Sequence, residues 1–252
     1  MNALVTSGGT IEPIDSVRGI TNFSTGALGA LIAENLTALG CSVLYVAPKT
    51  AAAPKQPCET LTVTDAASVE AAIKARAPRM DIIIHAMAVS DYRVAGASSV
   101  PSMSREIAKK ISALGGADEK IIADAVKTLF HAEKKGKIPS GLDDLTLLLE
   151  QTPKIIALLR SLAPNAVIAG FKLLSGVTRE ALIDVARALM RKSGADFMVA
   201  NDMSNITETA HIAHIISKAA AACEPETFGT KIETARALSQ KTFDLAAKRK
   251  EK

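Results

Sequence analysis

Tryptophan is absent from the 252-residue sequence, aromatic residues make up only 3% of it, and it contains three cysteines. So few aromatic side chains offer no ladder on which bases stack, which argues against binding of RNA or single-stranded nucleic acid. Cys41, Cys58 and Cys223 lie far apart and form no CxxC pair, so neither a disulfide framework nor a zinc ribbon is predicted. The expected location of such a protein is the reducing cytoplasm.

A long apolar run is also missing. No uninterrupted stretch approaches the roughly 18 apolar residues of a membrane span, and no basic segment precedes an apolar one at the N-terminus. The net charge of +4 comes mostly from residues 241–252, which hold five basic and two acidic residues. The excess positive charge therefore lies mostly in the C-terminal segment. This charge is compatible with a small anionic substrate.

Apolar runs and helical spacing alternate along most of the chain. Short apolar runs predict strands at residues 2–6, 41–47, 81–87, 166–171, 197–200 and 211–217. Helical spacing predicts helices at residues 25–39, 66–77 and 152–162, from residue 178 onward, and at 230–252. The first helix is expected to begin at Ser24 or Thr25 and to end at Gly40. This alternation predicts an α/β fold with a doubly wound, Rossmann-like, mostly parallel sheet.

Residues 95–149 interrupt the alternation. They are rich in Ser, Gly and Lys, with helical patches at 104–114 and 119–135 and an apolar stretch at 145–149. Connections of this length without structure of their own are uncommon in compact domains. We therefore expect a single domain over residues 1–252, in which residues 95–149 form an inserted subdomain or flap.

Two glycine-containing segments are candidates for phosphate binding. Gly8 and Gly9 follow the first predicted strand, and Ser24, Gly26 and Gly29 stand at the start of the first predicted helix. Backbone N–H groups at such a turn and helix start bind polyphosphates. The pattern is neither a GxGxxG fingerprint nor a Walker A loop. A loop and helix cap that only reverse the chain therefore remain the alternative.

Polar residues follow two of the predicted strands. Asp91 comes shortly after residues 81–87, and Asn201 and Asp202 come directly after residues 197–200. Because the carboxyl ends of parallel strands meet at one edge, these residues are expected to share a crevice. Asp91 would contact a ribose or nucleobase, help to hold Mg²⁺, or form an Asx turn. A dinucleotide site is disfavoured, because no acid follows the second predicted strand.

Histidines and lysines give weaker signals. His211 and His214 would face opposite sides of a strand and have no third ligand nearby, so no metal site is predicted. No GxSxG elbow or cysteine-nucleophile context is present. Lys134, Lys135 and Lys137 would either clamp an anion or form a solvated face.

Five segments make one longer pattern. They are TSGGTIEPIDSVRGITNFSTGALG at residues 6–29, AVSDY at 88–92, TPKI at 152–155, GFKL at 170–173 and VAND at 199–202. In this order they resemble the phosphopantothenoylcysteine synthetase family, the phosphopantothenate–cysteine ligases. The resemblance covers nearly the whole chain, with residues 95–136 least matched. Since no flavin-binding decarboxylase region precedes Met1, the chain is similar to the monofunctional bacterial-type form, and no flavin is expected.

The resemblance implies a two-step ligation in coenzyme A biosynthesis. The carboxylate of 4′-phosphopantothenate would attack a nucleoside triphosphate in the presence of Mg²⁺, and L-cysteine would displace the nucleotide from the acyl-nucleotidylate. The products would be phosphopantothenoylcysteine, NMP and pyrophosphate. CTP is expected rather than ATP, although residues 171–173 also resemble the eukaryotic variety. The flap would reach across a homodimer, so residues 95–149 would also serve dimerisation.

The resemblance also assigns roles to residues of this chain. Asn22 would hold the acyl intermediate, and Lys137 matches the essential lysine best, with Lys134 and Lys135 as alternatives because the flap is longer than in the bifunctional enzymes. The implied nucleotide-binding residues are Gly8, Gly9, Ser24, Gly26, Gly29, Ala86, Met87, Asp91, Thr152, Pro153, Lys154, Ile155 and Phe171. The rival hypothesis is a non-catalytic nucleotide- or NADP-binding module of Rossmann-like fold.

Overall fold

The computed structural model describes the chain except residues 115–117, 131–137, 139–143, 208–209, 221–222 and 252. The chain divides into two compact units. The first comprises Met1–Thr10, Asn22–Val89 and Lys154–Lys252, and the second comprises Ile11–Thr21 and Ser90–Pro153. Within the described part of the chain, no helix is both long and apolar enough to cross a membrane.

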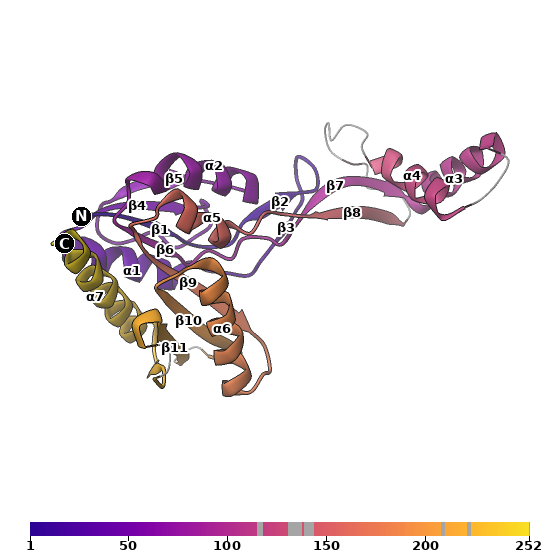
Figure 1. The fold of residues 1–252 in the computed structure, drawn as a ribbon. Helices are drawn as coiled ribbons and strands as arrows, with labels where there is room; N and C mark the ends of the chain where they lie inside the picture. Colours follow the sequence, from indigo (N-terminus) through magenta and orange to yellow (C-terminus); the bar gives the residue numbers. More distant parts are fainter. Residues whose placement is uncertain (115–117, 131–137, 139–143, 208–209, 221–222, 252) are drawn as a thin grey trace. The chain divides into compact units, whose positions relative to one another are not determined.

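An eight-stranded sheet forms the centre of the first unit, in the order β12-β11-β10-β9-β6-β1-β4-β5 (Figure 1). Its strands are β1 (Asn2–Thr6), β4 (Ser42–Ala47), β5 (Glu59–Thr62), β6 (Ile82–His85), β9 (Val167–Leu174), β10 (Phe197–Ile206), β11 (His211–Ser217) and β12 (Glu226–Phe228). The six strands from β10 to β5 pair in parallel, and β11 and β12 add antiparallel pairs at one edge. In chain order the parallel strands run 3-2-1-4-5-6, which is the doubly wound arrangement. The predicted fold class is confirmed.

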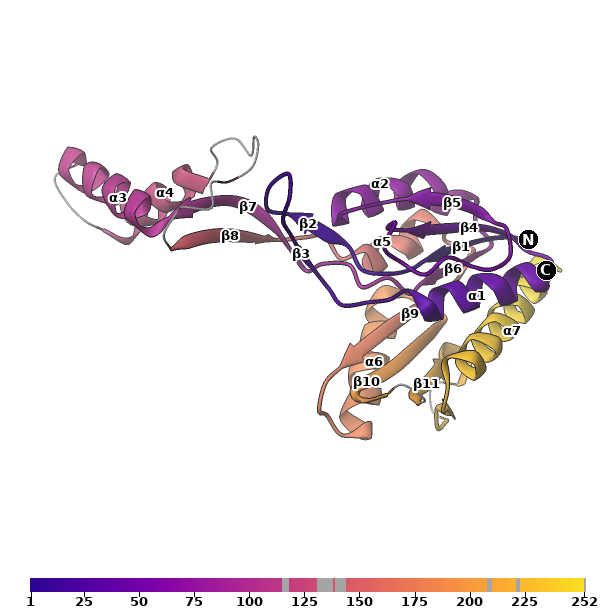
Figure 2. The same ribbon diagram turned by 180° about the vertical axis from the view of Figure 1, so that it is seen from behind.

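Helices cover both faces of this sheet. They are α1 (Ala27–Ala38), α2 (Ala66–Arg76), α5 (Ile155–Leu162), α6 (Arg179–Ser193) and α7 (Lys231–Lys250). Along β1, Leu4 packs in the core that contains residues of α2, α5 and α6, whereas Ala3 and Val5 pack in the core that contains residues of α1 and α7. Figure 2 shows α1 and α7 side by side. Because successive side chains of a strand point to opposite faces, strand residues covered on both sides are apolar on both faces, as residues 3–5 of β1 and 82–84 of β6 are.

Local signals mark the helix ends of the first unit, except at the starts of α1 and α5. The structure places Gly26 at the N-cap of α1, with φ 73° and no side-chain cap, so the predicted start at Ser24 or Thr25 is wrong. Only glycine adopts this left-handed conformation without strain. At the other end Gly40, with φ 86°, donates to Thr37 O and Cys41 N donates to Leu36 O, which closes the helix as a Schellman motif.

The helix α5 begins at Ile155, after Lys154 at an N-cap without a side-chain hydrogen bond, so the predicted start at residue 152 is wrong by three residues. The caps of α2, α6 and α7 use side chains. Asp65 and Ser68 form a capping box on α2, Thr178 accepts from Ala181 N on α6, and Thr230 caps α7 together with Glu233. These contacts satisfy N–H groups that a helix start otherwise leaves without a partner. They explain why the predicted starts of α6 and α7 agree with the structure to within a residue.

The second unit is built on two antiparallel pairs. These are β2 (Ile11–Pro13) with β3 (Gly19–Thr21), and β7 (Tyr92–Ser99) with β8 (Leu145–Gln151), and the helices are α3 (Val100–Leu114) and α4 (Glu119–Phe130). Asp15 closes the turn between β2 and β3 by accepting from the backbone of Val17 and from Arg18, and these donors hold its pKa well below the usual range. The predicted insertion at 95–149 falls inside this unit, which begins earlier and also includes residues 11–21.

Candidate functional site

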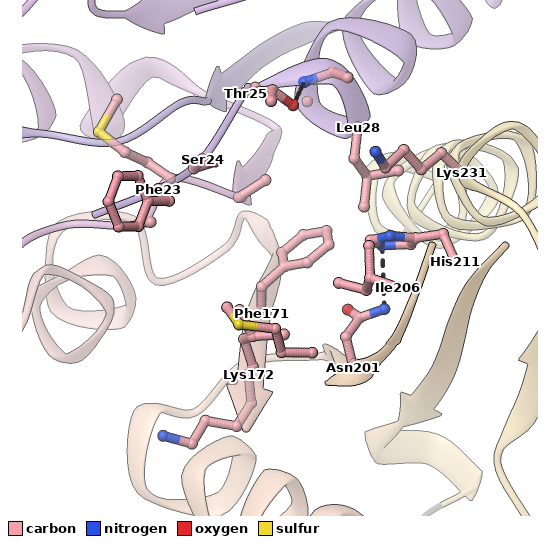
Figure 3. Close-up of a pocket in the computed structure, with 18 residues that line it drawn as sticks. Phe23, Ser24, Thr25, Leu28, Phe171, Lys172, Asn201, Ile206, His211 and Lys231 are labelled. Atoms are coloured by element: carbon pink, nitrogen blue, oxygen red, sulfur yellow. Dashed lines mark hydrogen bonds between the residues drawn. The ribbon is translucent and has the colours of Figure 1, made fainter. Parts of the chain in front are cut away.

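The strand order of the first unit reverses between β1 and β6, and open α/β sheets bind ligands beyond the carboxyl ends of strands at such a point. A cavity of about 430 Å³ lies there (Figure 3). Its lining comes from the start of α1, the residues after β6, the ends of β9 and β10, and the starts of β11 and α7. The lining residues are Phe23, Ser24, Thr25, Gly26, Ala27, Leu28, Gly29, Ala86, Met87, Ala88, Phe171, Lys172, Leu173, Asn201, Met203, Ile206, His211 and Lys231.

The polar side chains of the described lining are neutral or cationic. The described lining includes Lys172 and Lys231 but no carboxylate. The first turn of α1 has no acidic residue, and its N-cap Gly26 provides no side-chain acceptor. The first N–H groups of a helix and the positive end of its dipole attract anions. The cavity is therefore suited to a negatively charged ligand.

The glycine turn after β1 packs against protein. A Cβ at Gly8, where φ is 83°, would lie 2.7 Å from Ala51 Cβ and 3.0 Å from Pro48 Cδ. A Cβ at Gly9 would overlap the carbonyl of Asn22, and neither glycine is among the described residues of the lining. Glycine at position 8 therefore permits both the positive φ and the close approach of Pro48 and Ala51. No acid follows β4, which counts against a dinucleotide site.

Gly29 lets α1 pack closely against Ser7, the residue that follows β1. A Cβ there would overlap Ser7, whose hydroxyl donates to Gly26 O over 2.9 Å. Ser24, Gly26 and Gly29 nevertheless line the cavity. Three of the five predicted residues of the glycine segments therefore line the cavity, and Gly8 and Gly9 are not in its described lining.

A buried polar pair lies at the carboxyl ends of β1 and β6. Thr6 Oγ1 and His85 Nδ1 are 2.8 Å apart, and Thr6 is fully buried. Burial lowers the pKa of His85 to about 4, because a charged imidazole is poorly solvated in the core. A neutral histidine therefore links the two strands at the point where their order reverses. The residue pattern of the sequence does not mark His85 as a site residue.

The other predicted site residues occupy several places in the first unit. Ala86, Met87 and Phe171 line the cavity. Asn22 is exposed, and its Nδ2 donates to Ala88 O over 3.4 Å. Lys154 is exposed at the N-cap of α5, and the side chain of Ile155 is buried in the core on that face of the sheet.

Asp91, Thr152 and Pro153 belong to the second unit. The structure brings two of them together, since Thr152 N donates to Asp91 O over 3.0 Å and the Thr152 hydroxyl donates to Ser90 O. Lys134, Lys135 and Lys137 lie outside the described residues.

Asp202, predicted at the shared crevice, holds the loop that follows β9. Its carboxylate accepts from Gly176 N, Val177 N and the Ser204 side chain. These donors lower the pKa of Asp202 far below its usual range. Its neighbour Asn201 is the residue of this pair that lines the cavity.

His211 is a cavity residue that strand alternation alone did not reveal. Its Nε2 lies 3.2 Å from Asn201 Nδ2, while His214 turns to Thr227 at 2.8 Å and is not in the described lining. Burial and the neighbouring charge of Lys231 lower the pKa of His211. No group of three or more potential metal-binding side chains occurs among the residues that the structure describes.

A doubly wound sheet with a cation-lined cavity at its switch point defines a Rossmann-like protein suited to an anionic ligand. The chain belongs to the family described as the DNA/pantothenate metabolism flavoprotein C-terminal domain, which matches residues 1–111 and 97–245. The family resemblance predicted from the sequence is thereby confirmed.

Three similar proteins place the chain within this family. It is 32% identical over 203 residues to the coenzyme A biosynthesis bifunctional protein CoaBC of Thermococcus kodakarensis, covering 79% of this chain and 41% of that protein. It is 28% identical to phosphopantothenate–cysteine ligase 2 of Oryza sativa subsp. japonica, covering 80% and 68%.

The crystal structure of the DNA/pantothenate metabolism flavoprotein from Streptococcus pneumoniae superposes with a TM-score of 0.78 at 33% identity, over 96% of this chain and 97% of that one. The chain spans about two-fifths of the length of the bifunctional relatives it matches.

Proposed function

We propose that the protein is a phosphopantothenate–cysteine ligase of coenzyme A biosynthesis. It joins 4′-phosphopantothenate and L-cysteine through an acyl-nucleotidylate and releases NMP and pyrophosphate. The observation that carries the proposal is the cavity at the switch point, whose described lining holds two lysines and the start of α1 but no carboxylate. Both the triphosphate and the phosphorylated acid are anions, and relatives of this chain carry the name of this ligase.

The residues of the site suit the chemistry. Forming a mixed anhydride makes an unreactive carboxylate electrophilic, and the charge on the phosphates is offset by fixed donors and cations. The N–H groups at the start of α1 and Lys172 supply such groups. The exposed amide of Asn22 both donates and accepts, which suits an acyl intermediate. The mechanism requires no covalent nucleophile of the protein.

We assign the remaining nucleotide contacts as the family resemblance implies. Phe171, Ala86 and Met87 surround the nucleotide from the cavity wall. The backbone around Gly8, Gly9, Gly26 and Gly29 supports the phosphates, and Asp91 with residues 152–155 contacts the base and ribose. We further propose Lys137 as the lysine that completes the site.

Magnesium would enter with the nucleotide. Mg²⁺ in such sites is held by one or two carboxylates together with phosphate oxygens and waters, so a complete protein cage is not required. The single carboxylate of Asp91, which follows β6 in the sequence, fits that mode of binding. Bound Mg²⁺ would offset charge on the triphosphate.

The finer points of the proposal concern the co-substrate and assembly. We propose CTP as the nucleotide, no flavin, a cytoplasmic location, and a homodimer in which residues 95–149 serve as flap and dimerisation segment. The exposed apolar side chains of the second unit support the last point. Val100, Leu114 and Leu149 are 47%, 63% and 42% exposed.

Pyrophosphate release tests the function directly. Purified protein is supplied with 4′-phosphopantothenate, L-cysteine and Mg²⁺, with CTP and ATP in parallel reactions. Release that depends on phosphopantothenate is expected, faster with CTP, and mass spectrometry should find phosphopantothenoylcysteine. A folded protein that binds nucleotide but releases no pyrophosphate with either would instead be the non-catalytic binding module.

A further inference from the structure

One end of the cavity is formed by β10, β11 and the start of α7, and its polar side chains have no part in the function proposed above. Asn201, His211 and Lys231 meet there (Figure 3). The pairing of β10 with β11 changes register between Asn201 and Ile206, so that Ile206 lies opposite His211. Such bulges redirect side chains and are frequent beside functional sites.

Asn201 fixes which nitrogen of His211 carries the proton. Its Nδ2 donates to Ile212 O over 2.9 Å, which defines the orientation of the amide, because a carbonyl only accepts. The same Nδ2 lies 3.2 Å from His211 Nε2, so this ring nitrogen is the acceptor. A neutral imidazole with an accepting Nε2 carries its hydrogen on Nδ1.

The Nδ1–H donor of His211 is buried and has no hydrogen-bond partner among the described residues. Buried donors are almost always paired in native proteins, so one without a protein partner calls for an acceptor from water, an ion or a ligand. Since Nδ1 is covered, an acceptor reaches it only after a small shift of the ring or of its neighbours. An oxyanion bound in the cavity would supply the acceptor that the described residues do not.

Lys231 supplies a positive charge at the same end. It lines the cavity, and its charge is the second influence, after burial, that lowers the pKa of His211. No ion pair of Lys231 occurs within the described part of the chain, whereas Lys241 of the same helix pairs with Glu226 at 2.6 Å. A cation beside an unpaired N–H donor is the recognition pattern of an oxyanion.

We propose that His211 and Lys231 form an oxyanion subsite that takes a phosphate group, with Asn201 as the residue that positions the imidazole. The proposal deepens the proposed ligase function and rests on it for the source of the phosphate. That phosphate belongs either to the diphosphate end of the nucleoside triphosphate or to 4′-phosphopantothenate. Loss of a charge-assisted hydrogen bond weakens binding about 10-fold or more.

Direct binding distinguishes the two sources. Calorimetric titrations with pyrophosphate and with 4′-phosphopantothenate use wild-type protein, His211→Phe, Lys231→Met and the double variant. The phenyl ring keeps the packing and removes the donor, and His211→Gln returns a donor. Lys248→Met is the matched control, since Lys248 lies on α7 but outside the described lining.

We expect both single variants to weaken binding of the same ligand about 10-fold, with His211→Gln closer to wild type and Lys248→Met unchanged. The fold-loss of affinity in the double variant should be smaller than the product of the two single fold-losses, because both groups contact one oxyanion. Unchanged affinity for both ligands in folded variants overturns the subsite, and so does a wild-type protein that binds neither. The protein could lack ligase activity while its affinity for pyrophosphate still falls in the variants. That outcome would support the oxyanion subsite and contradict the proposed ligase function.

The positioning role of Asn201 has its own readout. Nitrogen-15 NMR of the imidazole reports the tautomer of His211, and the Nδ1–H form is expected in the wild type. Asn201→Asp turns the neighbouring donor into an acceptor and should move the proton to Nε2. A histidine that carries its proton on Nε2 in the wild type would contradict the proposed recognition.

Discussion

Asn22 is exposed on the first unit, and its Nδ2 donates to Ala88 O in a long contact of 3.4 Å, beside further contacts of the residue. Asn22→Asp removes the donor and adds a negative charge next to an anionic intermediate. We expect ligation to fall about 100-fold or more. The free energy of unfolding should change by less than about 0.5 kcal/mol, because the position is exposed.

Asn205→Asp is the matched control for this change. Asn205 is an exposed residue of β10, so the substitution adds the same charge outside the described lining of the cavity. Ligation rates and urea unfolding curves are measured for both variants. Wild-type ligation by Asn22→Asp would refute the role assigned to Asn22.

Lys137 and its neighbours allow a test of one assignment made from resemblance alone. Lys137→Ala, Lys135→Ala and Lys134→Ala each remove one charge from the same short segment. We expect only Lys137→Ala to lower ligation about 100-fold, because a single cation placed at the triphosphate stabilises its developing charge. Single-turnover rates with saturating nucleotide separate this effect from weaker binding. A larger loss in Lys134→Ala or Lys135→Ala would move the assignment to that residue.

His85 makes stability depend on acid pH. Its pKa in the folded protein is about 4, compared with 6.5 for the unperturbed group, so the folded state binds fewer protons than the unfolded state between these values. Stability from this group is present above about pH 6.5 and is lost as the pH falls toward 4. The loss is on the order of 3 kcal/mol.

His85→Gln keeps a hydrogen-bonding side chain beside Thr6 but cannot titrate. Urea unfolding measured from pH 7 to pH 4 should show a shallower fall in stability for this variant than for the wild type. Burial also lowers the pKa values of His211 and His214, so some acid sensitivity will remain. Parallel curves for the two proteins would show that His85 does not titrate in this way.

The sequence predicts site residues that belong to contiguous motifs. It does not predict residues that come together only when distant strands pair in the folded chain. Ser24, Gly26 and Phe171 stand in recognisable segments and do line the cavity. His211 was assigned to a strand face by simple alternation, whereas its place depends on the bulge in β10 and on the start of α7. Neither the bulge nor the contact with Asn201 has a local signal in the sequence.

At the scale of elements, the last turn of α7 ties this helix to the sheet. Arg249 donates to the Asp196 carboxylate at 2.6 Å, and the side chain of Asp196 is only 7% exposed and also pairs with Arg160. The adjacent Lys250 pairs with Asp81 at 2.8 Å, with both partners more exposed.

Comparison of Arg249→Ala with Lys250→Ala separates a buried contact from a surface one in the same helical turn. We expect Arg249→Ala to lower the free energy of unfolding by about 1–3 kcal/mol, because it removes a charged partner of a buried carboxylate. Lys250→Ala should lower the free energy of unfolding by less than about 1 kcal/mol. Urea denaturation at neutral pH measures both changes, and equal effects would contradict the importance given to the burial of Asp196.

The sequence predicts the helices and strands whose buried apolar residues recur at regular spacing or in an unbroken run. Residues 3–5 of β1 and 82–84 of β6 are apolar because both faces are covered, and the start of α7 is marked by its capping residues. β5 has no buried residue, and β2 and β3 have three residues each, so none of them leaves an apolar run to detect. The start of α1 was misplaced because the left-handed glycine at Gly26 took the place of a side-chain cap.

At the scale of the whole molecule, the second unit carries apolar side chains that its own fold leaves exposed. Leu145 and Leu149 lie on the same face of β8, four residues apart, and are 37% and 42% exposed. No residue of α3 is buried, although apolar residues recur along it at helical spacing. A soluble assembly is expected to cover such surfaces, which is why we propose that this unit carries the dimer contact.

Leu145→Ser together with Leu149→Ser tests that assembly. Sedimentation velocity over a range of concentrations should find the wild type at twice the 26.3 kDa chain mass. The double variant should dissociate at concentrations at least about 10-fold higher, because each buried leucine contributes roughly 1.5–3 kcal/mol to an interface. Glu150→Gln is the control, since Glu150 is exposed on the opposite face of β8 and pairs with Arg93 within the same unit. A wild-type monomer at all concentrations, or a dimer equally stable in the double variant, would reject this face as the contact between subunits.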